Sequence, residues 1–442
     1  MFITSLKIIK KLIYNPLLQS SGLLATEKLV RLVANIFVLA LVARYLGPER
    51  FGLLSLMLLA LGLALPVFML GLQKIVVREF IKARNPYELQ ETFSTALYLR
   101  ICISVFGWVL VSVALFVVDF ELGLAASILY SALVFHSFDV IEHYQQSISK
   151  LQIVFYARIA ATLVSAIAKI TLVVLDAELD MFVVAAWLDF SIFAVYLLLL
   201  FVRSKPPLSL NPRYFRLTTA VTLIKESWVE IFAAIAGIAL LRIDQVMVNQ
   251  YLGNEALGVY SVASRMTEAW YFVPMAIIAG FFPYVLRGQD ISDEEYGSRL
   301  QALMSIMLVV SISAALLFSI CGDGIIRLLF GESFLEAAEV LVVLAWSGCF
   351  MCIGLLSGSA LTAERKLKFN TMRNILGLLV NLLLNHLLLP IYGIIGAAWA
   401  TLIALSTSYL FFDLLFPATR HHFVIKLRSL SGIQLAKSLK KF

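Results

Sequence analysis

The chain has 442 residues, of which 61% are hydrophobic and only 14% are charged. Soluble domains average roughly 45–50% apolar and about 25% charged residues, so this composition excludes a soluble globular protein. The net charge of +7 comes from basic residues spread between apolar runs. No soluble basic domain gathers them, which excludes nucleic-acid binding as the reason for the charge.

Apolar runs recur along the chain, and each is long enough to cross the ~30 Å hydrocarbon core of a bilayer. They predict an all-α membrane protein with about twelve transmembrane helices. The expected helices cover residues 22–45, 51–73, 93–118, 122–144, 152–175, 181–202, 217–241, 257–286, 300–322, 337–361, 369–390 and 393–416. The two end segments, 1–21 and 417–442, are typical of basic amphipathic segments that lie on the membrane face.

The helices divide into an N-terminal six-helix bundle, 22–202, and a C-terminal six-helix bundle, 217–416, with a cytoplasmic linker, 203–216, between them. Lysine and arginine gather on one side of the predicted membrane, and the opposite side holds only Arg50 and Arg327. Because basic loops stay in the cytoplasm, we expect both termini to be cytoplasmic.

An internal repeat relates the two bundles. Segment 45–56, YLGPERFGLLSL, and segment 251–262, YLGNEALGVYSV, are identical at six of twelve positions. Each joins the first helix of a bundle to the second, and an even number of helices per bundle makes the repeat parallel. Glycine permits tight turns and close backbone approach. We assign a turn-packing role to Gly47, Gly52, Gly253 and Gly258.

A weaker echo aligns Tyr156-Ala157-Arg158 with Thr371-Met372-Arg373, each near the start of a fifth helix. Another aligns Ala185-Ala186-Trp187 with Ala397-Ala398-Trp399 in the sixth helices. These echoes extend the repeat beyond its first turn, and they place corresponding arginines in the two halves.

The stretches ARYLGPERFGLLSL and RIDQVMVNQYLGNEALGVYSVASRM, followed by Pro274 and the Phe282-Pro283 pair, resemble polysaccharide exporters and O-antigen flippases. These belong to the multidrug/oligosaccharidyl-lipid/polysaccharide exporter superfamily, and the resemblance covers nearly the whole chain. It implies a V-shaped fold of two six-helix bundles that works by alternating access. The peptidoglycan-precursor flippases of the superfamily usually carry more helices than are expected here, which argues against that branch.

The resemblance also implies the cargo and its setting. The cargo is an undecaprenyl-diphosphate-linked oligosaccharide, the repeat unit of O-antigen or another surface polysaccharide, which is moved across the bacterial inner membrane. The implied partners are membrane lipids and, in the same pathway, a polysaccharide polymerase and a chain-length regulator. No cofactor is implied.

Cations deep inside the predicted helices are candidates for binding the diphosphate. An ionisable residue at the bilayer centre costs on the order of 2.5–3.5 kcal/mol, so it must be paired or must line a wet cavity. The cations least able to reach water along their own helices are Arg31, Arg100, Lys169, Lys225 and Arg265. The alternative for two of them is pairing at helical spacing, Arg31 with Glu27 and Arg265 with Glu268.

Acidic residues in the spans are candidates for ion coupling, because a buried carboxylate can carry a proton near neutral pH. These candidates are Asp189, Glu230 and Glu268. The alternative is a structural ion pair with a neighbouring helix. His136, Asp139 and His143 are spaced i, i+3 and i+7, so they form a polar stripe on one helix face. The stripe lacks further ligands, and we interpret it as a cavity wall and expect no metal.

Two other functions remain open from the sequence. A drug/cation antiporter of the same superfamily should have a net acidic cavity, whereas a carrier of anionic lipid needs a basic one. A membrane polysaccharide polymerase needs catalytic residues, and the chain contains no Ser/His/Asp constellation and no phosphate-binding loop. We therefore expect a transporter and not an enzyme.

Overall fold

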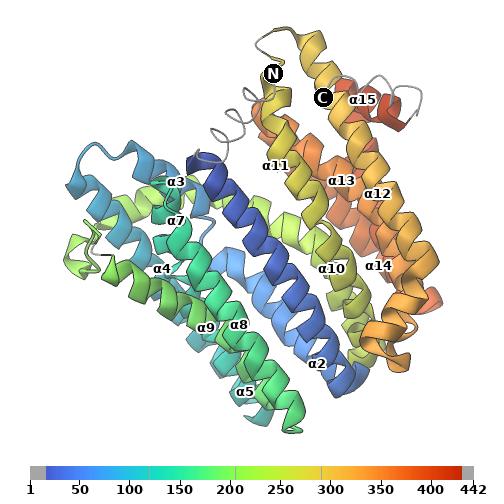
Figure 1. Cartoon of the computed structure of the whole chain (residues 1–442), viewed down its shortest axis with the longest axis horizontal. Helices are drawn as coiled ribbons and strands as arrows, with labels where there is room; N and C mark the ends of the chain where they lie inside the picture. Colours follow the sequence, from blue (N-terminus) through green and yellow to red (C-terminus); the bar gives the residue numbers. More distant parts are fainter. Residues whose placement is uncertain (1–15, 119, 205, 290, 431–442) are drawn as a thin grey trace, which may run out of the picture. The chain divides into compact units, whose positions relative to one another are not determined.

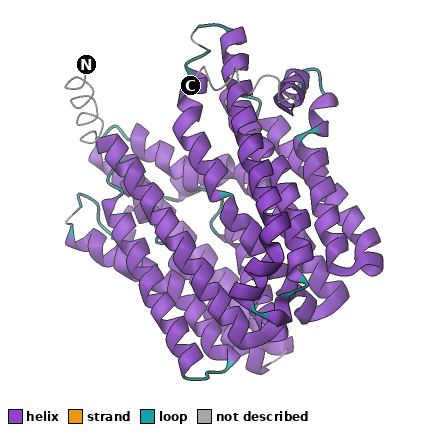
Figure 2. Ribbon diagram, turned by 45° about the vertical axis from the view of Figure 1, so that its right-hand side comes forward, coloured by secondary structure: helices purple, strands orange, loops and turns teal. Residues whose placement is uncertain are grey.

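The computed structural model describes residues 16–118, 120–204, 206–289 and 291–430. Every regular element in these ranges is a helix, as Figure 2 shows. The elements are α2 Pro16–Phe68, α3 Gln73–Lys82, α4 Pro86–Val118, α5 Phe120–Tyr130, α6 Ala132–His136, α7 Asp139–Ser147, α8 Gln152–Val174, α9 Leu179–Arg203, η1 Pro212–Tyr214, α10 Leu217–Trp270, α11 Phe272–Leu286, α12 Asp293–Phe330, η2 Glu332–Phe334, α13 Ala337–Ala363, α14 Leu367–Tyr409, η3 Phe411–Leu414 and α15 Arg420–Leu430. The expected segment 1–21 lies outside the described residues, apart from the first residues of α2.

Three long helices each contain one glycine at which the backbone leaves helical geometry. These are Gly47 in α2, Gly253 in α10 and Gly393 in α14, with φ angles of +71°, +83° and +59°. In α14 the chain doubles back, because Asn381 donates a hydrogen bond to Thr401 at 3.3 Å although 20 residues separate them. A straight helix of that length would hold them about 30 Å apart.

Nine stretches of the described residues are long and apolar enough to cross a membrane. Three of these stretches run to 53, 57 and 48 residues, at least twice the ~20 residues that one crossing requires. They contain the glycine breaks of α2, α10 and α14, so each has room for two of the predicted spans. The chain is an all-helical, multi-pass membrane protein, and the total of twelve spans stays a prediction.

The chain forms two compact units. Unit 1 comprises Met1–Val42 and Ala60–Ile235, and unit 2 comprises Ala43–Leu59 and Ala236–Phe442. The predicted linker, 203–216, therefore lies within unit 1. The first turns of α10 belong to unit 1 because Glu230 pairs with Lys74 and the backbone of Ile231 lies against Gly71.

In unit 1, α8 and α9 lie side by side, and α5 packs against both α4 and α9 (Figure 1). Four aromatic rings from α3, α4, α7 and α9 form a core whose ring centroids lie 5.7 to 6.2 Å apart. They belong to Phe80, Phe93, Tyr144 and Phe201. This core fixes α7, which carries part of the predicted polar stripe.

In unit 2, α13 packs against both α12 and α14, and α15 packs against α12 (Figure 1). Small residues allow α13 to approach its neighbours closely. A Cβ added to Gly354 would lie 2.5 Å from the ring of Tyr409, and one added to Gly358 would lie 2.9 Å from the guanidinium of Arg373. The α13 surface around these glycines therefore fits the side chains of α14.

Candidate functional site

The two repeat turns lie against each other in unit 2. A Cβ added to Gly52 would overlap the backbone oxygen of Asn254, and one added to Gly258 would overlap that of Pro48. Gly47 and Gly253 have open space around them but adopt φ angles of +71° and +83°, which favour glycine. Two of the four glycines are therefore suited to close backbone approach and the other two to the turn conformation.

Arg100 is the most deeply buried of the predicted cations. Its exposed fraction is 2%, and its Nε donates to the backbone oxygen of Met69 at 3.3 Å. Its Nη1 has no hydrogen-bond partner within the described ranges. Asp139 and His143 of α7 lie close enough to interact with it electrostatically.

The polar stripe lies beside Arg100 but is not on one continuous helix. The predicted helix 122–144 is divided into α5, α6 and α7, and His136 ends α6 whereas Asp139 begins α7. His136 Nδ1 lies 3.1 Å from Asp139 Oδ2. His136 Nε2 and His143 Nδ1 are buried without partners among the residues described. Unpartnered buried nitrogens require an explanation, and bound water would supply one.

Each predicted coupling carboxylate lies beside a basic side chain. Lys169 Nζ of α8 lies 2.6 Å from Asp189 of α9, Lys74 Nζ of α3 lies 3.3 Å from Glu230, and Arg242 Nη2 lies 2.7 Å from Glu268 across the α10 hairpin. This geometry supports the structural-pair alternative for all three carboxylates. Their role in coupling stays a prediction.

The remaining predicted cations differ in their surroundings. Arg31 already has an interaction partner. Lys225 is exposed in unit 1. Arg265 shares its surroundings with Arg242 and Glu268 in unit 2, and in the described part of the chain it makes no hydrogen bond that competes with a ligand. Unit 2 therefore brings two guanidinium groups to one carboxylate, and sequence reasoning missed Arg242 as a member of this cluster.

Asp244 is a buried carboxylate that sequence reasoning missed. Its exposed fraction is 3%, and it accepts hydrogen bonds from the Tyr260 hydroxyl, from Thr401 Oγ1 at 3.0 Å and from the Gln245 backbone N–H at 2.8 Å. Asn381 donates to Thr401, and Asn385 donates to Asn381 Oδ1 at 2.8 Å.

This Asp244 network has no basic residue within hydrogen-bonding distance in the described ranges. Asp244 stands in the RIDQ stretch that precedes the second repeat segment, but its partners in α14 lie more than 130 residues further on, and no local spacing joins them. Its own i, i+3 and i, i+4 neighbours give no sign of the network, which forms only when α10 and α14 pack.

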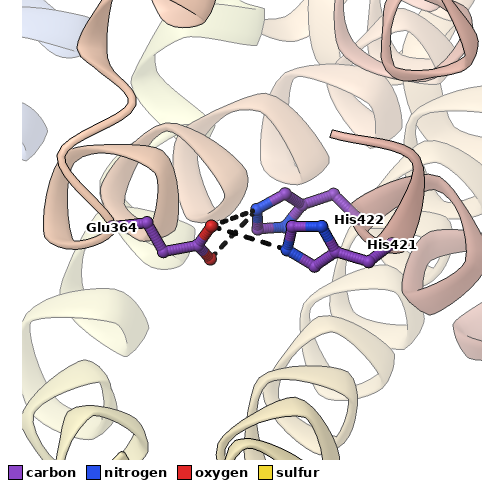
Figure 3. Close-up of side chains that lie close together, drawn as sticks. All are labelled: Glu364, His421 and His422. Carbon is purple, nitrogen blue, oxygen red and sulfur yellow. Dashed lines mark hydrogen bonds and ion pairs between the residues drawn. The ribbon is translucent and has the colours of Figure 1, made fainter. Parts of the chain in front are cut away.

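Glu364 lies beside two histidines in the first turn of α15, as Figure 3 shows. His422 Nε2 is 3.0 Å from Glu364 Oε1, and His421 Nε2 is 3.5 Å from Glu364 Oε2. The three ligand atoms lie within 4.8 Å of one another, a spacing that a divalent metal can use. Lys366 Nζ already lies 2.8 Å from the same carboxylate, so we assign the cluster to docking of α15 and not to a metal.

Burial and hydrogen bonding oppose each other in this cluster. Burial alone would raise the pKa of Glu364, but hydrogen bonds from His421, His422 and Lys366 bring that pKa well below its usual range. Burial lowers the pKa of His422, and the hydrogen bond to Glu364 offsets part of that effect. The folded cluster therefore favours an ionised carboxylate and a neutral His422.

The sequence is similar to two named proteins of glycan biosynthesis. It is 24% identical over 212 residues to the protein named "Probable low-salt glycan biosynthesis flippase Agl15" from Haloferax volcanii, covering 46% of this chain and 43% of that protein. It is 22% identical over 190 residues to the capsular polysaccharide biosynthesis protein CapF from Staphylococcus aureus, covering 42% of this chain and 48% of that protein. The matches thus span less than half of each relative.

Two solved structures share the fold. An inward-facing multidrug resistance MATE family transporter of the MOP superfamily aligns with a TM-score of 0.67 at 12% identity, covering 94% of this chain and 99% of that one. The lipid II flippase MurJ in an inward closed conformation aligns with a TM-score of 0.67 at 16% identity, covering 94% and 92%. The fold is therefore that of the MOP exporters. Residues 41–339, more than half of the chain, match the family described as "Polysaccharide biosynthesis protein", and the chain belongs to this family.

Proposed function

We propose that the protein flips a lipid-linked oligosaccharide, with an undecaprenyl-diphosphate anchor, from the cytoplasmic to the outer leaflet. The observation that carries the proposal is the cluster of Arg242, Arg265 and Glu268 in unit 2, where two guanidinium groups lie near one carboxylate. Arg242 pairs with Glu268 and also acts electrostatically on Asp244, so Arg265 is the guanidinium of this cluster without an ion pair among the described residues. A guanidinium inside a membrane protein suits an anionic ligand.

The same observation weighs against the antiporter alternative. A carrier of cationic drugs needs an excess of carboxylate at its site, whereas Glu268 is already paired with Arg242 at 2.7 Å. The pair leaves the charge of Arg265 uncompensated by any ion pair in the described residues. A diphosphate would supply the missing negative charge during transport.

Arginine suits this chemistry because its planar fork donates two hydrogen bonds to two phosphate oxygens at once. The oligosaccharide and the diphosphate cannot cross hydrocarbon unaided, while the polyprenyl chain can stay in the lipid. The protein needs to provide a polar path for the head only. Alternating access would then expose that path to one side of the membrane at a time.

We further propose that Asp244 is the group that couples transport to an ion. Its carboxylate accepts hydrogen bonds from two hydroxyls and a backbone N–H, and Arg242 acts on it electrostatically without a hydrogen bond. Oxygen ligands of this kind can hold a small cation, and a carboxylate without a basic hydrogen-bond partner can alternatively bind a proton. This favours Asp244 over Asp189, Glu230 and Glu268, which lie beside basic residues.

The proposed setting is the bacterial inner membrane with both termini in the cytoplasm. The exported repeat unit would pass to a polysaccharide polymerase and a chain-length regulator. The arginine cluster would recognise the diphosphate and not the sugars, so the same site could serve repeat units of different sugar sequence.

Deletion of the gene tests the function directly. We expect single lipid-linked repeat units to accumulate on the cytoplasmic side of the membrane, and the wild-type gene to restore export. Arg265→Gln should restore export about tenfold less well at equal protein level, since it removes a charge-assisted contact. Arg327→Gln serves as a matched control, because Arg327 is exposed and paired with Glu332.

A deletion strain whose repeat units reach the outer leaflet normally would contradict the proposed function. Full export with Arg265→Gln and with the double variant Arg242→Gln/Arg265→Gln would instead remove the Arg242–Arg265–Glu268 cluster from the mechanism. A strain that regains drug resistance through the gene, without any change in its polysaccharide, would favour the antiporter.

A further inference from the structure

Arg373 is a buried guanidinium near the start of α14. Its exposed fraction is 2%, and its Cζ lies 4.8 Å from the centroid of the Tyr409 ring. Nη1 donates to Ser357 Oγ at 2.7 Å, and Nη2 donates to the backbone oxygen of Gly354 at 2.8 Å. Nε has no partner among the described residues. Both acceptors are neutral, so these hydrogen bonds bring no negative charge to the guanidinium.

The internal repeat contains a second arginine that serves as a reference for Arg373. Arg158 stands at the corresponding place near the start of the fifth helix of the first half, and its Cζ lies 4.6 Å from the centroid of the Phe193 ring. Arg158 Nη2 donates to Glu142, which precedes it by 16 residues. Ser357 precedes Arg373 by the same 16 residues. The second half has therefore kept the arginine on its aromatic ring but holds a serine where the first half has the carboxylate.

The residues around Arg373 do not supply the negative charge that Glu142 gives to Arg158. Asp413 is the acidic residue that acts on Arg373 electrostatically, and its Oδ2 lies 2.7 Å from Lys426 Nζ. Burial lowers the pKa of Lys426 to about 8, so this ammonium is still charged at neutral pH and neutralises Asp413. One positive charge is left in excess around Arg373. Burying a charge without a counter-charge is costly, which indicates that an anion belongs beside it.

A cavity of about 590 Å³ adjoins this charge. Its polar lining consists of Arg373, Asn370, Asn374, Ser359, Thr362 and Tyr409. The side-chain oxygen of Asn374 is buried without a partner among the residues described. Gly358 leaves the room that the guanidinium occupies, because a Cβ there would lie 2.9 Å from Arg373 Nη2. The cavity thus combines one uncompensated cation with amide and hydroxyl donors, the groups that bind phosphate oxygens.

We propose that this cavity of unit 2, between α13 and the start of α14, binds the phosphate head of a membrane lipid through Arg373. The cavity shares no lining residue with the cluster of Arg242, Arg265 and Glu268. The phospholipid case does not depend on the proposed transport, whereas the cargo case rests on the proposed function. Two lipids carry the required chemistry: an anionic phospholipid such as phosphatidylglycerol, and the diphosphate of a polyprenyl carrier. The phospholipid would be a bound structural or regulatory lipid, and the polyprenyl diphosphate would be the cargo.

Ser357→Glu tests the proposal most sharply, because it restores in the second half the carboxylate that the first half holds at Glu142. The new carboxylate should pair with Arg373, keep the protein folded and weaken lipid binding by about tenfold or more. Ser357→Gln has the same length without the charge and should bind nearly as the wild type. Arg373→Gln should also lose lipid binding. Arg158→Gln removes the reference arginine of the first half and should bind lipid as the wild type does.

Native mass spectrometry of the purified full chain would measure the binding, with undecaprenyl diphosphate and phosphatidylglycerol as probes and phosphatidylcholine as the zwitterionic comparison. Loss of undecaprenyl diphosphate alone in Ser357→Glu identifies a cargo site, and loss of phosphatidylglycerol identifies a lipid site. Equal binding of all probes by wild type and Ser357→Glu would overturn the proposal. Thermal unfolding of each variant separates lost binding from lost folding. A flippase assay on the wild type and on Ser357→Glu separates the two proposals. Flipping by the wild type supports the proposed function whether or not Ser357→Glu changes lipid binding.

Discussion

Asp244 differs from the other acidic residues of the spans in its hydrogen-bond partners. Asp189 and Glu268 each lie within 2.7 Å of a basic nitrogen, whereas Asp244 is held by the hydroxyls of Tyr260 and Thr401. A hydroxyl can rotate and either donate to an ionised carboxylate or accept from a protonated one. The Asp244 site can therefore exist in two charge states without leaving a strong ion pair broken.

We expect Asp244→Asn to fold and to lose the dependence of transport on an ion gradient. The amide is nearly the size of the carboxylate and can still accept a hydrogen bond, so packing should change little. In proteoliposomes, flipping by the wild type should respond to an imposed Na⁺ or pH gradient, since a tenfold ratio supplies about 1.4 kcal/mol. Flipping by Asp244→Asn should be the same with and without either gradient.

Asp189→Asn provides the contrast at the residue scale. It leaves Lys169, 2.6 Å away, without its partner, and it should lower the amount of folded protein while the remaining protein keeps its response to the gradient. A full gradient response in Asp244→Asn, or its loss in Asp189→Asn alone, would transfer the coupling role to Asp189.

At the scale of elements, α15 is held against unit 2 by polar contacts more than by an apolar face. Lys426 donates to Asp413 and to the backbone oxygen of Tyr409, and Ser429 donates to the backbone oxygen of Gln301 of α12. His422 and His421 reach Glu364 (Figure 3). Lys426 is fully buried, so this part of the tail 417–442, which was expected to lie on the membrane face, packs on protein through a lysine.

Acidification should release α15. The pKa of His422 is lowered by burial from the usual 6.5, so the unfolded or undocked state takes up its proton first, and docking weakens as the pH falls below about 6.5. The pKa of Glu364 lies below its usual 4.5, so its contribution is lost below that pH, in the same direction.

Hydrogen exchange of the α15 amides at pH 7 and pH 5.5, corrected for the intrinsic rates, measures this release. The double variant His421→Gln/His422→Gln keeps amide donors toward Glu364 but has no imidazole in the cluster, and its exchange should be the same at both pH values. Lys426 acts on the cluster as well, and its pKa of about 8 keeps it protonated at both pH values. Unchanged protection of α15 in the wild type at pH 5.5 would show that His422 does not control docking.

The ends of a helix could be predicted well from the sequence where the length of an apolar run sets them. They could be predicted less well where packing against other helices sets them. The runs that form α8, α9 and α13 were placed within a few residues, because each must cross the bilayer once. The breaks between α5, α6 and α7 were not predicted: His136 and Asp139 are in contact across the second break, and Ser131 at the first break donates to the backbone oxygen of Ile128. The compact units also differ from the predicted bundles, because α10 continues through the turns that carry Glu226 and Glu230 into unit 1.

The site was only partly predictable for the same reason. Depth in a helix identified Arg100, which is buried, and Arg265, which is half-buried, because depth follows from position along one span. Partners on other helices do not follow from position, so Asp244 and its α14 network were missed, and Arg373 was noted only as part of a weak repeat near the start of a helix. The repeat could have indicated Arg373, since comparison of Glu142 with Ser357 uses sequence alone.

At the scale of the whole molecule, the proposed cargo carries charge across the membrane, and the membrane potential therefore acts on transport. The cell interior is negative, and one elementary charge is worth about 2.3 kcal/mol per 100 mV. A diphosphate head with two negative charges would move outward downhill by roughly 4–5 kcal/mol per 100 mV. At equilibrium this favours the outer leaflet by on the order of a thousandfold.

This reasoning predicts electrogenic flipping. In proteoliposomes with a potassium gradient and valinomycin, a potential that is negative on the cytoplasmic side should speed outward movement of undecaprenyl diphosphate, and the opposite potential should slow it. If Arg265 moves with the head, one negative charge is neutralised and the potential dependence is halved, to about 2.3 kcal/mol per 100 mV. Arg265→Gln should then make the potential dependence steeper while lowering the rate. Nigericin, which exchanges potassium for protons without setting a potential, is the control. If the flipping rate does not change with the potential in either the wild type or Arg265→Gln, the head crosses with its charge fully compensated and the prediction is wrong.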